Sequence, residues 1–397
     1  MTMRAIPGLL ATALAASLGL GAPASAASAD VWKVPADATI TVRGHGYGHG
    51  HGMSQYGAEG AARKGLTYRQ IVRFYYPGTE WGQARGRVTV LITADTTDDL
   101  VVVARKGLTV RDTAGGKPLP LPDNGASRWK VAVGSDGVNR VLFRTHRWHR
   151  WHALDGQGEF YAAGEPVTLV TPTGERAYRG RLRVGVTSSG DRVTVNDLAL
   201  DNYLRGVVPL EIPASWSPDA VRAQAVAARS YAAYERAHPQ SAAYQLCDTW
   251  SCQVYGGYDA EYPASDTAVQ DTAKQVLLSG GDPAFTQFGS SSGGWTSAGS
   301  VSYLPAQKDP YDGWAGNPVH TWSTRLGDEV LERTWPAVGD LRRIAVTKRD
   351  GNGDWGGRVV SLTLSGTDGK VAVSGDTFRS LLGLRSTWMT FRVSSAA

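Results

Sequence analysis

Residues 217–236, SPDAVRAQAVAARSYAAYER, carry the clearest secondary-structure signal in the chain. A serine followed by proline, with Asp219 in the first turn, is typical of a helix N-terminus, so the pattern predicts a helix over 217–236. The side chains are mostly Ala and Val, which lets neighbouring backbones approach closely. Three arginines recur every seven residues and share one face, which is either solvated or supports a site through Arg229 and Gln224.

Strands flank this helical region on both sides. From residue 87 to about 196, short runs of alternating apolar and polar residues are separated by turn pairs, and strand patterns return after residue 342. We therefore expect an α+β fold, with a mixed helical and β-rich region and an inserted or flanking all-β subdomain. The expected divisions are a Gly/His-rich segment with helices (27–86), a β-rich accessory subdomain (87–196) and the main region (197–397).

The composition fits a folded protein and leaves several functional classes without support. The chain has 397 residues, 42% of them apolar and 19% charged, which excludes a disordered tail, a coiled coil and a collagen-like fibre. A net charge of +5 has a surface effect that salt screens within ~10 Å, so we expect no nucleic-acid partner. The sequence contains no phosphate-binding loop and no zincin helix.

Residues 1–26 have the pattern of a signal peptide. Arg4 precedes an apolar run over 6–20, and small residues lead up to Ala26. We expect cleavage after Ala26 and a secreted protein, with an uncleaved anchor as the alternative. The run is shorter than the ~20 residues that a spanning helix needs, so we expect no membrane span after cleavage.

Export also bears on the two cysteines, Cys247 and Cys252. In an oxidising compartment a disulfide closing this short loop is favoured. A zinc site with His238 as a third ligand is the alternative, because thiolate and imidazole are ligands that zinc prefers.

Glu211 stands among apolar residues in 207–216, VVPLEIPASW, between two prolines. An isolated glutamate is most often a surface group. If this segment lines a cleft, however, its apolar neighbours would desolvate the carboxyl group and raise its pKa. Glu211 would then be a proton donor near neutral pH.

Two glycine-rich stretches have the features of ligand-facing loops. Residues 44–56, GHGYGHGHGMSQY, have glycine at every second position, so an extended chain would place the histidines on one face and bare glycine on the other. A purely structural loop and a metal site are the alternatives, although same-side Cα atoms ~6.6 Å apart are wide for chelation. Residues 288–295, FGSSSGGW, offer backbone N–H groups and hydroxyls to a ligand.

Several of these stretches together resemble the SpoIID/LytB family of cell-wall proteins. The likeness covers about residues 198–395 and 40–80, and the strand-rich middle carries little of it. The segments that carry it are DNYLRGVVPLEIP (201–213), RAQAVAARSY (222–231), CQVYGG (252–257), SSGG (291–294), LGLRSTW (382–388) and GHGHGMSQYGA (48–58).

The resemblance implies a secreted peptidoglycan lytic transglycosylase of the cell wall or extracellular space. Such an enzyme cleaves glycan strands, and the family's sporulation member acts on strands stripped of stem peptides. The resemblance makes 197–397 the catalytic region, with 27–86 part of its core, and requires no cofactor. Glu211 matches the acid of the family's motif and is the expected catalytic residue. The expected groove residues are Gln224, Arg229, Ser291, Ser292 and Tyr303, with His49 and Gln55 from the Gly-His loop.

Two other functions stay open. Some relatives enhance an amidase instead of cleaving glycan, so the chain could be a non-catalytic wall-binding protein whose partners are other wall hydrolases. Glu211 would then be structural, and region 87–196 would bind the wall or a protein. A glycoside hydrolase is the other alternative, and it needs a second acid, for which Asp201 or Asp248 would have to come from afar.

The sequence departs from the family pattern in two places. Gly289 stands where members commonly carry a histidine before the Ser-Gly-Gly turn. The Gly-His hallmark usually follows the LGLRST segment, yet here it lies near the N-terminal end. If the fold is shared, the loop 44–56 must therefore lie beside the segment 374–393.

Overall fold

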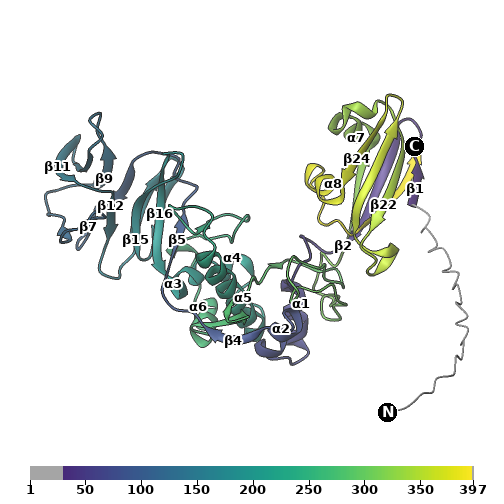
Figure 1. The fold of residues 1–397 in the computed structure, drawn as a ribbon, viewed down its shortest axis with the longest axis horizontal. Coiled ribbons are helices and arrows are strands. Elements are labelled where there is room, and N and C mark those ends of the chain that lie inside the picture. The colour runs from purple at the N-terminus through teal and green to yellow at the C-terminus, as the bar shows by residue number, and fades with distance from the viewer. Residues whose placement is uncertain (1–29, 396–397) are drawn as a thin grey trace, which may run out of the picture.

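The computed structural model describes residues 30–395 and divides into three parts along its long axis (Figure 1). We call them the accessory part (87–199), the central part (46–86 and 200–320) and the terminal part (30–45 and 321–395). The expected signal peptide, residues 1–26, lies outside the described residues. Within residues 30–395 no helix has the length and apolar character needed to cross a membrane.

The accessory part consists of two sheets that are antiparallel apart from one strand. Their orders are β11-β10-β9-β6-β13-β14 and β17-β5-β16-β15-β12-β7-β8, where β17 (Leu246–Cys247) comes from the central part and runs parallel to β5. The other strands are β5 (Arg87–Leu91), β6 (Leu100–Val103), β7 (Thr109–Asp112), β8 (Leu119–Pro120), β9 (Arg128–Val133), β10 (Asn139–Arg144), β11 (Trp148–Leu154), β12 (Gly158–Tyr161), β13 (Val167–Thr171), β14 (Gly174–Tyr178), β15 (Arg181–Val186) and β16 (Arg192–Ala199).

The central part is mostly helical, and α5 (Pro218–Ala237) runs through it. This helix confirms the prediction over 217–236, and its small side chains let α1, α2, α3 and α6 pack against it. A capping box at Thr67 and Gln70 begins α2. The other elements are α1 (Gln55–Arg63), α2 (Tyr68–Tyr75), α3 (Leu200–Arg205), α4 (Val208–Glu211), η1 (Tyr258–Ala260), α6 (Pro263–Asp271), β3 (Met53–Ser54), β4 (Glu80–Gln83), β18 (Gln275–Ser279), β19 (Asp282–Pro283) and β20 (Phe288–Gly289).

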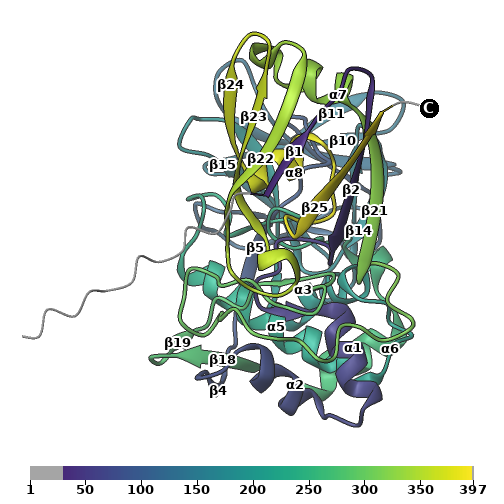
Figure 2. The ribbon, with the colours of Figure 1, turned by 90° about the vertical axis from the view of Figure 1, so that its right-hand side faces the viewer.

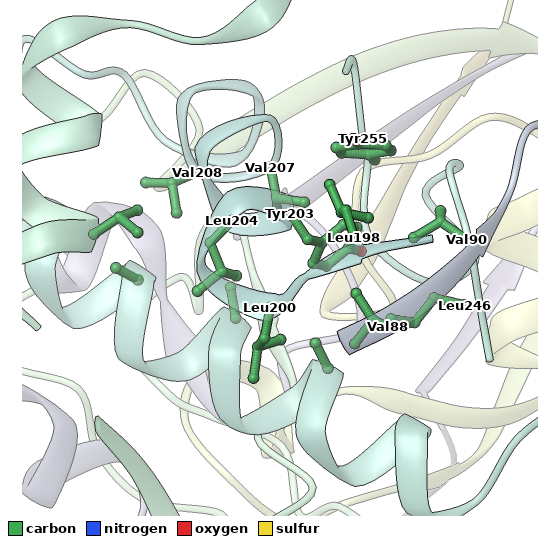
Figure 3. Packing of buried hydrophobic residues seen from close by; sticks show 14 of the residues in the cluster. Val88, Val90, Leu198, Leu200, Tyr203, Leu204, Val207, Val208, Leu246 and Tyr255 are labelled. Carbon is green, nitrogen blue, oxygen red and sulfur yellow. The ribbon is translucent and has the colours of Figure 1, made fainter. Parts of the chain in front are cut away.

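The accessory and central parts share one hydrophobic core. Val88 and Val90 on β5 contribute to the same buried cluster as Leu204 on α3 and Tyr255, which follows the disulfide loop (Figure 3). Each of these side chains is at most 2% exposed. This continuous apolar packing fixes the accessory sheets against the helices, because separating the two parts would expose the cluster to water.

The terminal part has its own core and joins the two ends of the described chain. Its sheets have the orders β1-β22-β23-β24 and β21-β2-β25, so N-terminal strands lie among C-terminal ones, as Figure 2 shows. Ile40, Ile344 and Phe378 belong to a separate buried cluster. The elements are β1 (Asp30–Lys33), β2 (Ala38–His45), β21 (Thr321–Gly327), α7 (Asp328–Thr334), η2 (Pro336–Val338), β22 (Leu341–Arg349), η3 (Asp354–Gly356), β23 (Val359–Gly366), β24 (Lys370–Ser374), α8 (Gly375–Leu381) and β25 (Met389–Ser395).

The fold is α+β with a β-rich region, as the sequence predicts. Two cores divide the chain differently from the expected ranges, however. The main region 197–397 contributes to both cores, and the segment 27–86 is split between the terminal and central parts. The reason is that β2 pairs with β25 through seven residue pairs, from Ala38 with Ser395 to Gly44 with Met389, and strand pairing across this distance leaves no local signal.

Candidate functional site

One cleft of about 630 Å³ gathers residues from distant segments where the central part meets the terminal part. Arg379 comes from the terminal part and the other residues from the central part. Within this lining, all of it in the described residues, Glu211 is the one carboxyl group. The lining residues are Tyr47, Gly48, His49, Gln55, Glu211, Tyr231, Trp250, Ser251, Cys252, Val254, Gln287, Phe288, Gly289, Ser290 and Arg379.

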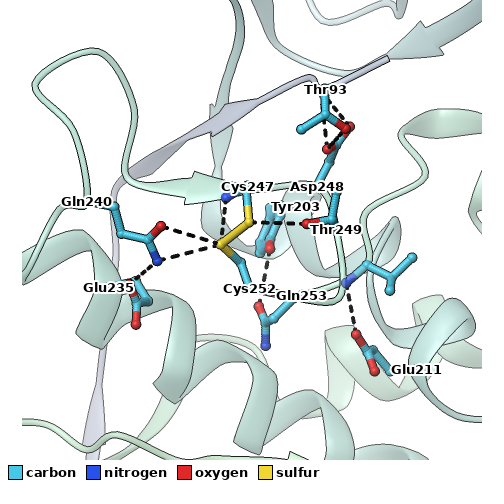
Figure 4. Close-up of a disulfide and its surroundings, with 11 residues drawn as sticks. Thr93, Tyr203, Glu211, Glu235, Gln240, Cys247, Asp248, Thr249, Cys252 and Gln253 are labelled. Atoms are coloured by element: carbon cyan, nitrogen blue, oxygen red, sulfur yellow. Dashed lines mark hydrogen bonds between the residues drawn. A yellow bond between two sulfur atoms is a disulfide. The ribbon is translucent and has the colours of Figure 1, made fainter. Parts of the chain in front are cut away.

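Glu211 is the last residue of α4, and its carboxyl group is held by two donors. Its Oε1 accepts a hydrogen bond of 2.9 Å from the Val254 N–H (Figure 4), and its Oε2 lies 3.5 Å from Gln55 Nε2. Burial raises the pKa of the Glu211 carboxyl above its ordinary value, while the two hydrogen bonds act in the opposite direction. The side chain therefore has the environment of a proton donor at the surface of a cleft.

A short loop closed by the Cys247–Cys252 disulfide borders Glu211 (Figure 4). The structure has the disulfide that the sequence favours. Because the two sulfurs are bonded to each other, they are not the thiolates that zinc requires. His238 is engaged elsewhere: its Nδ1 lies 3.0 Å from the Tyr234 carbonyl. The loop carries Trp250, whose side chain is 87% exposed at the edge of the cleft.

The Gly-His loop is not the extended segment that its alternating pattern predicts. Beyond His45 the glycines at 46, 48, 50 and 52 all adopt positive φ, which turns the chain repeatedly and breaks the alternation of faces. His45 packs against Trp388 in the terminal part, whereas His49 stacks on His51 with ring centroids 4.9 Å apart. Of the three histidines, only His49 lines the cleft.

The imidazole of His49 is held neutral by its surroundings. Its Nδ1 accepts a hydrogen bond of 2.9 Å from the His51 N–H. Burial, followed by the charges of His51, Arg379 and Arg358, lowers the pKa of His49 to about 4. At neutral pH this side chain can therefore donate or accept a hydrogen bond but carries no charge.

The Gly-His loop lies beside the C-terminal segment, as the displaced hallmark predicts. The Gly48 N–H donates to the Arg385 carbonyl, and the His45 N–H donates to the Trp388 carbonyl. Ser386 Oγ in turn donates to the His45 carbonyl over 2.6 Å. The prediction that 44–56 contacts 374–393 is confirmed, so the terminal strands carry the loop to the cleft.

The serines of the Gly-Ser turn point away from the cleft, contrary to expectation. Ser291 and Ser292 are each 2% exposed. Ser291 Oγ donates to the fully buried Asp312 carboxylate, and Ser292 Oγ donates to Asp309 Oδ2 over 2.8 Å. The turn instead presents the neighbouring Ser290 to the cleft.

Asp312 is the centre of the polar network beneath this turn. Its carboxylate accepts hydrogen bonds from Ser54 Oγ at 2.6 Å, from the backbone N–H groups of Ser292 and Gly293, and from Asn317 Nδ2 at 3.0 Å. His320 Nδ1 lies 2.8 Å from it, and this contact raises the pKa of His320. Asp312 thus ties the start of α1 to the Gly-Ser turn.

Three further expected groove residues do not line the cleft either. Arg229 is fully buried, where it pairs with Asp201 Oδ1 at 2.7 Å and donates to the Val269 carbonyl, so it joins α5 to α3 and α6. Gln224 is fully buried in α5. The Tyr303 hydroxyl accepts a hydrogen bond from the Phe285 N–H. Arg229 and Tyr303 thus connect segments of the central part, whereas the buried amide of Gln224 has no hydrogen-bond partner within residues 30–395.

Sequence reasoning missed several residues that the structure brings to the cleft. Tyr47 and Trp250 are exposed aromatic side chains, and both lie in segments that the sequence already singles out. Their aromatic character beside the expected acid is a signal that could have found them. Arg379 is one arginine among many, on a helix with no local mark of a site, so its position depends on the tertiary fold.

Comparison with known proteins places part of the chain in a family. Residues 188–278, which include Glu211 and the disulfide loop, match the family model SpoIID, described as Stage II sporulation protein. This match confirms the resemblance to the SpoIID family that is drawn from the sequence. No solved structure matches the chain.

Curated relatives match over similar lengths. The chain is 36% identical over 140 residues to the Amidase enhancer of Bacillus subtilis, which is 34% of this chain and 19% of the relative. It is 53% identical over 144 residues to Stage II sporulation protein D of Bacillus subtilis, and 29% identical over 143 residues to that of Bacillus amyloliquefaciens. Each of the latter two matches covers 30% of this chain and 41% of the relative. The matches thus span from about a fifth to two fifths of these relatives.

Proposed function

We propose that this protein is a peptidoglycan lytic transglycosylase that acts outside the cytoplasm, at the cell wall. The observation that carries the proposal is the Glu211 carboxyl group, partly desolvated in a cleft that it shares with exposed aromatic side chains. Trp250 and Tyr47 suit the faces of sugar rings, because an aromatic ring packs well against their apolar C–H surfaces. The proposed substrate is a glycan strand, including one stripped of its stem peptides.

A single carboxyl group can perform this chemistry. Protonated Glu211 gives its proton to the glycosidic oxygen as the bond from that oxygen to C1 of the muramoyl residue breaks. The resulting carboxylate then takes the proton of the C6 hydroxyl of the same sugar, whose oxygen bonds to C1 and closes a 1,6-anhydro ring. The nucleophile belongs to the substrate, so the reaction consumes no water and needs no metal or cofactor.

The environments of Asp201 and Asp248, the two acids that a hydrolase could have used, favour this chemistry over glycoside hydrolysis. A hydrolase uses a second carboxyl group to position water or to attack the sugar. Asp201 is paired with Arg229, and Asp248 accepts hydrogen bonds from the Thr93 N–H and hydroxyl. Neither side chain belongs to the cleft lining, whose one carboxyl group is Glu211.

The amidase-enhancer alternative rests on the match to the relative of that name. Under it, Glu211 would be structural, because its Oε1 accepts the Val254 N–H and so ties α4 to the disulfide loop. If the role of the Glu211 carboxyl group is to accept this bond, a glutamine amide could replace it without loss of function. The two functions therefore differ in the expected effect of Glu211→Gln.

The deciding experiment digests purified, peptide-free glycan strands with the wild type and with Glu211→Gln and identifies the ends by mass spectrometry. We expect anhydro-muramic ends from the wild type and a loss of at least ~10²-fold in their rate with the variant, the range for a general acid. The melting temperatures of the two proteins should be similar. Reducing ends would indicate a hydrolase. Absence of cleavage by both, with stimulation of an amidase by both, would support the enhancer.

A further inference from the structure

Arg379 is the one arginine or lysine in the cleft lining and is provided by α8 of the terminal part. Its nearest carboxylate in the described structure is Asp376, whose Oδ1 lies 3.9 Å from Arg379 Nε and whose side chain is 81% exposed. An exposed pair at this distance contributes little free energy. The Nε atom is buried and has no hydrogen-bond partner within residues 30–395, while the side chain as a whole is 25% exposed. The guanidinium group is therefore available to a ligand.

The other ionisable groups of the cleft do not neutralise Arg379. Glu211, the one carboxyl group of the lining, forms no ion pair with Arg379 within 4 Å, and burial raises its pKa. The pKa of His49 is lowered to about 4, so this side chain carries no charge at pH 7. Arg358 lies behind the Gly-His loop, where it donates to the Ser292 carbonyl and where the carboxylates of Asp350 and Asp312 offset its charge. Arg379 is therefore the positive charge that the cleft lining itself presents, and a bound anionic group would be stabilised beside it.

We infer that Arg379 is a specificity-determining residue that binds the lactyl carboxylate of a muramoyl residue from which the stem peptide has been removed. The planar guanidinium group can donate two parallel hydrogen bonds to a carboxylate. In an intact strand this carboxyl group is the amide that carries the peptide, and it has no negative charge. The N-acetylglucosamine residues have no carboxyl group.

This inference rests on the proposed function. Stem peptides carry carboxylates of their own, which are a second source of the same chemistry. The experiment therefore has to separate the lactyl group from the peptide.

The test compares three glycan substrates: peptide-free strands, the same strands with the lactyl carboxylate converted chemically to a primary amide, and strands with intact stem peptides. With Arg379→Gln, we expect KM for peptide-free strands to rise about 10- to 100-fold with kcat little changed, the effect of losing a charge-assisted pair. The wild type should show the same rise when the carboxylate is amidated, whereas Arg379→Gln should not distinguish the two strands.

Two variants control for charge and geometry. Arg325→Gln removes an exposed arginine of β21 that is outside the cleft lining, and it should leave KM unchanged. Arg379→Lys keeps the charge but loses the planar fork, so its KM should be intermediate. Burial and His51 lower the pKa of His49 more than Arg379 does, so NMR titration should show only a modest rise of that pKa in Arg379→Gln if the local fold is intact.

Equilibrium binding separates this inference from the proposed function. Glu211→Gln and the double variant Glu211→Gln/Arg379→Gln are tested for binding of the three strands, which requires no turnover. Tighter binding of peptide-free than of amidated strands, lost in the double variant, supports the carboxylate site even if no strand is cleaved. Equal binding of both strands by both variants overturns it. A preference for peptide-bearing strands that depends on Arg379 would assign the carboxylate to the peptide and overturn the lactyl assignment.

Discussion

The two walls of the cleft are built in different ways. One wall carries Glu211, Tyr231 and Val254, which lie within 43 residues of one another along the chain and inside the region that matches the SpoIID family model. The opposite wall combines the Gly-His loop, the Gly-Ser turn and Arg379, all outside that region. The acid thus belongs to a local unit, whereas the groups proposed to bind substrate are assembled from three distant segments.

The physical basis of each wall differs accordingly. The wall of Glu211 depends on apolar packing around the small side chains of α5, which are fully buried for the most part. The opposite wall depends on the buried carboxylate of Asp312 and on glycines with positive φ. Changes beneath the opposite wall should therefore disturb substrate binding first, and they reach the acid through Gln55 at the start of α1.

The largest effect is expected for Asp312→Ala. Removing this carboxylate leaves several buried donors without an acceptor, among them Ser54 Oγ and the backbone N–H groups of the Gly-Ser turn. Breaking a buried, charged network of this kind costs about 3–5 kcal/mol of unfolding free energy. Urea unfolding followed by tryptophan fluorescence measures the loss.

The matched control for this change is Asp340→Ala. Asp340 is 69% exposed in its pair with Arg342, and an exposed pair contributes less than about 1 kcal/mol. A loss for Asp312→Ala no larger than that of the control would show that the Gly-Ser turn is held by other contacts. The comparison between the two walls would then fail, because neither would depend on a buried charge.

The same contrast explains how much of the site the sequence could predict. Glu211, the helix over 217–236 and the contact of loop 44–56 with 374–393 follow from local motifs or from the family pattern. Ser291 and Ser292 could not be placed, because their partners Asp309 and Asp312 leave no pattern that joins them to the turn. A hydroxyl in a Gly-Ser turn looks the same in sequence whether it faces a ligand or a buried carboxylate.

Arg229 shows a second limit on what the sequence can predict. The seven-residue spacing correctly places three arginines on one face, but Arg222 pairs with Asp271 at the surface whereas Arg229 is fully buried against Asp201. Helical periodicity defines a face and does not say what covers it. The packing of α3 and α6 decides the role of each arginine.

An intermediate effect is expected for Gly52→Ala in the Gly-His loop. Gly52 has φ of +66°, and a Cβ atom there would lie 2.0 Å from the Gln287 carbonyl oxygen, beside the cleft. The control is Gly65→Ala, where φ is +86° but no atom lies within 4 Å of the added carbon. Both changes should cost about 1–2 kcal/mol for the left-handed backbone. Gly52→Ala should cost about 1–3 kcal/mol more, for overpacking.

Two measurements on these variants test the opposite wall directly: thermal and urea unfolding, and KM for peptide-free strands. We expect Gly52→Ala to raise KM because Gln287 lines the cleft, and Gly65→Ala to leave KM unchanged. Equal destabilisation by the two substitutions would mean that the loop can move away from Gln287. The close backbone contact would then have no part in shaping the wall.

The smallest effect is expected where Gln55 contacts the acid. Its Nε2 lies 3.5 Å from Glu211 Oε2 and favours the ionised carboxylate, so it lowers the pKa of Glu211 against the effect of burial. Gln55→Leu should therefore raise that pKa further, because it removes a donor that stabilises the ionised carboxylate.

Because the reaction needs protonated Glu211, kcat falls as pH rises through this pKa, and in Gln55→Leu the fall should begin at higher pH. The profile of kcat against pH on peptide-free strands measures the shift, with Gln83→Leu on the exposed side of β4 as the control that should not move it. A fall that begins at lower pH in Gln55→Leu would mean that the amide oxygen accepts a hydrogen bond from protonated Glu211 and stabilises its neutral form. The cleft would then hold its acid protonated through Gln55, and burial alone would no longer account for the raised pKa.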